Sequence, residues 1–246
     1  VSLSFVLDQG DDGDTVTASA TNSIGGTAPF DAHSVTVSSD AMGTLKFSGE
    51  GGSSASTSID TTAAGDIWDN FDGKKGHSAG TAGVAVANSD PGDNSFFYTL
   101  PSMVDGLAVN ASYKPQGSTA ESAIGYGVAY TGVEGLAVHY ATTDIEGATV
   151  ALSGDQTVLK ATYAYGPVTV GYSNSEVDMG DTTLATDQET TSYAISYTVS
   201  DAISVTYGTE EIDKGSEAID AEYEVIKGSY TSGGMTVSAS MKDGSN

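Results

Sequence analysis

The sequence predicts an all-β protein, a transmembrane antiparallel β-barrel whose apolar face meets lipid. Apolar and small polar residues alternate with period 2 over long stretches, as in 192–208 (SYAISYTVSDAISVTYG). Successive side chains of a strand point to opposite faces, so this stretch reads as a hairpin with one apolar face. Several stretches run to roughly nine residues or more, longer than the strands of most soluble proteins. Most charged residues fall between the stretches.

The first 50 residues contain short alternating segments that we expect to form four strands. They are 1–7 (VSLSFVL), 15–22 (TVTASATN), 33–39 (HSVTVSS) and 44–50 (TLKFSGE). The rhythm then breaks over residues 49–93, which hold the only tryptophan, Trp68, and a group of aspartates. A connection of that length is usually functional or disordered.

Five longer hairpins follow, which brings the expected number of strands to fourteen. They are 94–114, 122–143, 157–173, 192–208 and 222–241. From 122 onward the hairpins begin about 33 residues apart, the length of two strands of about 9–11 residues with a tight turn and a longer loop. In the last hairpin Ile226 and Tyr230 are out of phase with Tyr223 and Val225, so we expect either a β-bulge there or an error in the assigned register.

The apolar face could meet either lipid or the core of a soluble β-sandwich. All 13 tyrosines lie in the strand segments, most of them near a turn, where a membrane barrel places amphipathic rings at both interfaces. A sandwich of this charge would place many acids and lysines on its solvent face. The second face carries mainly Ser, Thr, Gly and Ala instead, so we expect lipid.

The charge balance narrows the partners of the chain. Lys and Arg together number 8, all of them Lys, against 33 Asp plus Glu, a formal net charge of −25. Nucleic acid is therefore excluded as a partner, because a phosphate-binding surface needs clustered cations. The absence of cysteine excludes thiolate metal sites. With no cysteine and no nucleophile motif near its 3 His, the chain is not expected to be an enzyme.

Metal binding has weak support in the sequence. The run 8–15 (DQGDDGDT) resembles the start of a calcium loop, but its twelfth position holds Ser19 where a bidentate Glu is needed. The acid-rich loops 176–189 and 210–222 either bind Ca²⁺ or Mg²⁺ loosely or form solvated negative surface. We expect no tightly bound cofactor.

The chain resembles the alphaproteobacterial general porins, a family of 16-stranded trimeric outer-membrane barrels. Residues 33–66 (HSVTVSSDAMGTLKFSGEGGSSASTSIDTTAAGD) are similar to a strand, tight turn and strand followed by an inward-folded third loop. Residues 94–114 and 122–141 are similar to the hairpins that follow. The resemblance implies one barrel domain, 1–246, with 49–93 as the constriction loop. It also implies that one strand is missing at each end, because only four precede the loop and the chain stops at SMKDGSN.

The resemblance also implies a pore constriction. Asp60, Asp66, Asp69 and Asp72 of the loop would line its narrowest point, and by strand parity Lys46, His139 and Lys160 point inward from the wall. Opposed charges there would set a transverse field, with a cation preference for the pore. The alternative is that these aspartates are ordinary solvated loop residues.

As a function, the resemblance implies passive diffusion of small hydrophilic solutes and ions across the outer membrane of a Gram-negative bacterium. The partners would be lipid, lipopolysaccharide and two further copies in a homotrimer, with residues 1–50 and the terminal strands at the subunit contact. Two alternatives remain open. One is a secreted acidic β-rich adhesin or surface-layer protein, and the other is a channel specific for one sugar or acid.

Overall fold

The structure, a computed structural model, consists of one antiparallel sheet of 13 strands. It describes residues 1–7, 30–64, 94–115, 122–147, 149–150, 153–180, 187–215 and 220–245. The strands are β1 (Ser2–Leu7), β2 (Phe30–Ser39), β3 (Gly43–Glu50), β4 (Ser95–Thr99), β5 (Leu107–Lys114), β6 (Ser122–Tyr130), β7 (Leu136–Glu146), β8 (Gly154–Tyr165), β9 (Val168–Met179), β10 (Gln188–Ser200), β11 (Ile203–Lys214), β12 (Ala221–Ser232) and β13 (Met235–Ser245).

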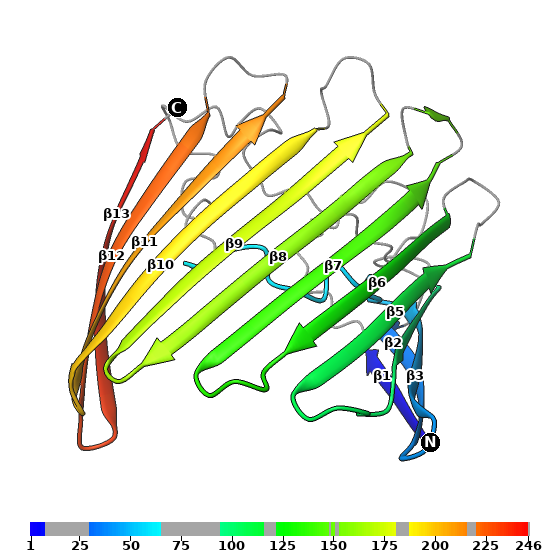
Figure 1. Ribbon diagram of the computed structural model, residues 1–246, viewed down its shortest axis with the longest axis horizontal. Coiled ribbons are helices and arrows are strands. Elements are labelled where there is room, and N and C mark those ends of the chain that lie inside the picture. The colour runs from blue at the N-terminus through cyan, green and yellow to red at the C-terminus, as the bar shows by residue number, and fades with distance from the viewer. Residues whose placement is uncertain are drawn as a thin grey trace, which may run out of the picture.

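Each strand pairs with its neighbours in the chain, so the sheet is a simple meander from β1 to β13 (Figure 1). Short turns such as 166–167 and 201–202 lie at one end of the strands, and the longer connections lie at the other. At the first of these turns Gly166 has φ 56°, a value that glycine adopts without strain. The alternation of short and long connections expected from the sequence is confirmed.

The two faces of the sheet differ as the alternation predicts. We call the face that carries residues 51–64 the inner face and the opposite one the outer face. Tyr193, Ile195 and Tyr197 of β10 lie on the outer face, with 55%, 47% and 47% of their surface exposed. Ser192 of the same strand is fully buried on the inner face. The outer face is therefore an exposed apolar surface, and it is not packed against a second sheet in the described structure, as a soluble sandwich would require.

Two expectations about individual strands have different outcomes. The expected strand 15–22 lies outside the described residues, which is why 13 strands are described and not fourteen. Of the two alternatives for the last hairpin, the β-bulge is wrong, because β12 pairs with β11 and β13 without a register shift. Ile226 and Tyr230 face outward with the other apolar residues, while Tyr223 and Val225 are buried on the inner face. The phase change therefore reflects apolar residues on both faces of one regular strand.

Within the described residues, no helix is long and apolar enough to span a membrane.

Because the outer face meets lipid, a charge on that face of β10 should destabilise the protein more than a charge at the adjacent inward position. Ile195→Lys places a cation on the outer face and should lower the free energy of unfolding by about 2–4 kcal/mol. Ser196→Lys at the same depth faces inward and loses one hydroxyl contact, the 2.8 Å bond between Ser196 Oγ and Thr206 Oγ1, so it should cost about 1 kcal/mol. Urea unfolding in lipid vesicles measures both; equal losses would contradict the assignment of the faces.

Candidate pore constriction

Residues 51–64, which we call the docked segment, leave β3 and cross the inner face of the sheet (Figure 1). The docked segment contacts five strands, β5 and β7 to β10, through hydrogen bonds. Ser54, Ala55, Ser56 and Thr62 are almost completely buried against the wall. The segment therefore fills part of the space in front of the inner face.

The first anchor of the docked segment lies over β5 and β7. Ala55 N donates to Ser112 Oγ at 2.9 Å, and Ser56 Oγ lies 2.7 Å from Thr143 Oγ1. A local turn positions these groups, because Ser54 N donates to Thr57 Oγ1 and Thr57 N donates to Ser54 Oγ. Side chain and backbone polar groups are therefore satisfied where the segment is most buried.

The second anchor lies over β9 and β10. Ser192 Oγ accepts from the backbone of both Ala63 and Ala64, at 3.0 and 3.3 Å. Ser173 Oγ donates to the carbonyl of Thr61 at 2.9 Å. Both serines are fully buried. A buried donor without a partner costs about 1–3 kcal/mol. Ser192, which accepts from the amides of Ala63 and Ala64, therefore holds the segment close to the wall.

Glycines of the wall allow this close approach. A Cβ at Gly208 of β11 would lie 2.4 Å from Ala64 Cβ, and one at Gly125 of β6 would lie 2.6 Å from Ser112 Oγ. Real Cβ atoms do not come that close to their neighbours, so a larger residue at either position displaces something. These positions explain part of the Gly content of the inner face, where glycine permits close backbone packing.

Between the anchors, Lys160 of β8 pairs with Asp60. Lys160 Nζ donates to Asp60 Oδ2 and also to the carbonyl of Thr62 at 2.8 Å. The Lys160 side chain is 18% exposed and that of Asp60 is 57% exposed. Exposed ion pairs contribute only about 0–1 kcal/mol, so the buried hydroxyl contacts hold the segment more firmly than this pair does.

The residues expected at the constriction are only partly brought together. Lys160 faces inward and His139 lies directly opposite it on β7. Lys46 of β3 also shares the inner face, since Ser48 two residues along is buried there, but among the described residues no ion pair or hydrogen bond joins it to the docked segment. Asp60 is in direct contact with Lys160, and the transverse field expected from opposed charges stays a prediction. Asp66, Asp69 and Asp72 lie outside the described residues.

Sequence reasoning missed the residues that hold the docked segment in place. Ser112, Thr143, Ser173 and Ser192 were recognised only as members of the small polar face. A signal was present in the strands, since serine or threonine occupies inward positions of β5 and of β7 to β10. The pattern alone does not distinguish a hydroxyl that meets water from one that binds a distant segment.

The chain matches the model of the Gram-negative porin family over residues 1–246. No curated protein matches. Among solved structures, an engineered variant of the porin of Rh. blastica has a TM-score of 0.57 at 20% identity, covering 98% of this chain and 82% of its own.

Two further structures share the fold. The anion-selective porin from Comamonas acidovorans has a TM-score of 0.53 at 15% identity and covers 88% of this chain and 69% of its own. The in-vitro folded outer membrane protein OmpT of Vibrio cholerae has a TM-score of 0.55 at 18% identity, with 87% and 69% covered.

The site geometry predicts that Ser192→Ala loosens the docked segment. The two backbone donors of Ala63 and Ala64 lose their acceptor, so the segment should move away from the wall more often and raise the open-channel current noise. Ser204→Ala is the matched control, because Ser204 Oγ bonds only Ser229 Oγ in the described structure, on a part of the wall away from the segment. Single-channel recording would contradict the role of Ser192 if both variants gave the same noise.

A bulkier residue at Gly208 should displace the docked segment outright. In Gly208→Val the new side chain overlaps Ala64, so the single-channel conductance should change. Gly228→Val on β12 is the control, since a Cβ there meets nothing within 4 Å. An unchanged conductance in correctly folded Gly208→Val would show that the segment does not narrow the passage.

The match over residues 1–246 decides the family, and this family suggests a channel rather than an enzyme: the chain is a Gram-negative porin of the bacterial outer membrane.

Proposed function

We propose that this porin is a passive diffusion channel for small hydrophilic solutes and ions. The observation that carries the proposal is the docked segment, held on the inner face by Ser112, Thr143, Ser173 and Ser192. A segment fixed across the inside of a barrel reduces its cross-section and excludes large solutes, while small ones pass without a chemical step.

The complete channel in this proposal is a closed barrel of 16 strands, as in the alphaproteobacterial porins that the sequence resembles. Closure is needed because an open sheet edge leaves backbone groups without partners in hydrocarbon. The fold shared with the Rh. blastica variant supports this view, since the chain covers 82% of that protein.

The proposed assembly is a homotrimer that uses the outer face of β1 to β4. Leu3, Val35, Val37, Leu45 and Phe96 are exposed there. No charged side chain lies on the outer face of β1 to β6 in the part of the chain whose side chains are described. An apolar surface free of charge suits a contact between identical subunits in a membrane.

The fold of the chain does not determine whether the pore prefers cations or anions. The expected cation preference rests on the net charge of −25 and on loop aspartates, of which Asp60 is paired with Lys160. One solved structure of the same fold is an anion-selective porin, so the fold itself does not determine the sign. The proposal therefore includes no cation preference.

The proposed function predicts ohmic single-channel steps when the detergent-solubilised protein is added to a planar lipid bilayer. The current should rise linearly with voltage and should not saturate with one sugar or acid, which a substrate-specific channel would show. Sedimentation in detergent should give the mass of three chains. A protein that stays monomeric in water without detergent and gives no current would refute the channel and favour a secreted β-rich protein.

A further inference from the structure

The charged residues of the strands are divided between the two faces of the wall. Lys46, Lys114, Lys160, Lys227 and Lys242 lie on the inner face, as their register with buried inward residues shows. Strands β7 to β12 carry opposed carboxylates on the outer face, in the pairs Asp144 and Asp155, Glu176 and Glu189, and Glu211 and Glu222. Among the described side chains, the inner face of the wall is therefore basic, although the net charge of the chain is −25.

Lys227 and Lys242 are the inward lysines farthest along the chain from the docked segment. Lys242 pairs with Val225, which is buried on the inner face, and Lys227 lies two residues further along the same strand. Lys227 pairs with Ser240, so the two lysines are diagonal neighbours on one face. Diagonal positions in an antiparallel pair lie about 7–8 Å apart. Both side chains are exposed, so they face the water on the inner side.

Inward carboxylates do not neutralise this pair within the described structure. Asp60 is bound to Lys160, and the only other described inward carboxylate of the strands, Glu210, is 1% exposed and has an interaction of its own. Neither Lys227 nor Lys242 has an ion-pair partner among the described residues. Their charges are therefore available to solutes.

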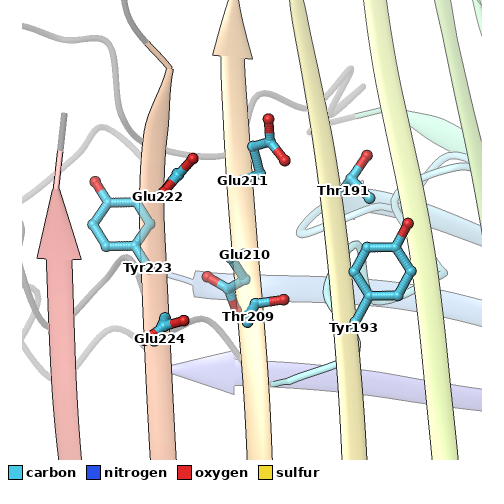
Figure 2. Close-up of a pocket in the computed structure, with 8 residues that line it drawn as sticks. All are labelled: Thr191, Tyr193, Thr209, Glu210, Glu211, Glu222, Tyr223 and Glu224. Atoms are coloured by element: carbon cyan, nitrogen blue, oxygen red, sulfur yellow. The ribbon is translucent and has the colours of Figure 1, made fainter.

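The carboxylates on the outer face of β11 and β12 lie on the opposite side of the wall from the two lysines. Glu211, Glu222 and Glu224 lie at the end of β11 and β12 where the long connections begin, around a shallow pocket (Figure 2). They point away from the inner face, and the apolar outer residues such as Tyr207 and Ile226 lie between them and the short-turn end. Exposed charges separated by more than a Debye length, about 8 Å at physiological salt, are largely screened.

We propose that Lys227 and Lys242 form an anion-attracting track on the pore wall, which favours the passage of small solutes carrying a carboxylate or phosphate group. The inference rests on the proposed diffusion channel and identifies its solute class. The track acts on permeation because its charges face the water path, whereas the carboxylates on the outer face of β7 to β12 face away from it.

The test is the reversal potential of single channels in a gradient of KCl. Replacing both lysines, as Lys227→Gln with Lys242→Gln, should lower the chloride-to-potassium permeability ratio by about twofold or more, because each charge acts within a Debye length of passing ions. Lys227→Glu with Lys242→Glu should lower it further. Heat-modifiable migration on a gel verifies that each variant is folded.

The control removes the same amount of charge from the other side of the wall. Glu211→Gln with Glu222→Gln leaves a neutral pair where two like charges now stand opposite each other, and the permeability ratio should stay unchanged. The inference is overturned if the lysine variants leave the ratio unchanged or if the glutamate control shifts it equally. Absence of channels in the unmodified protein would instead refute the proposed function.

Discussion

The structure depends on the need to pair every backbone amide and carbonyl of a segment that crosses hydrocarbon. Strands that pair only with their sequence neighbours satisfy this need through an antiparallel ladder from β1 to β13, with register shifts in three of its pairs. Once the ladder is fixed, each side chain has only two possible directions. The sequence of each strand then decides which residues meet lipid and which meet the inner side, and this choice positions both the docked segment and the charges of the wall.

Because the ladder is regular, much of the fold could be predicted from residue alternation. Tyr193, Ile195 and Tyr197 lie on the face expected for them, and the charged ends of the strands begin where the apolar residues stop. The prediction was wrong at Tyr223 and Val225, because apolar residues were assumed to share one face. These two are buried on the inner face, where an apolar side chain gains from burial as it does in a soluble core.

The constriction was less predictable because it depends on contacts between residues far apart in the chain. Asp60 and Lys160 were both selected from the sequence, but their direct contact follows from the path of the docked segment, which no local pattern encodes. Ser192 binds backbone groups 128 and 129 residues away, through a hydroxyl that looks like any other on the small polar face. Gly208 is informative only once Ala64 is known to lie above it.

Because the two faces of the wall meet different environments, the composition of the chain is a poor guide to which solutes pass through the pore. A formal charge of −25 would dominate the behaviour of a compact soluble protein, whose surface presents all of its charges to the same solvent. In a barrel wall, residues one position apart, such as Ile226 and Lys227, face different environments. Solutes in the pore respond to the charges on the inner side within a few ångströms, where the described strands place lysine and hold Asp60 in an ion pair. The selectivity of such a channel therefore follows from the register of its strands more than from its total charge.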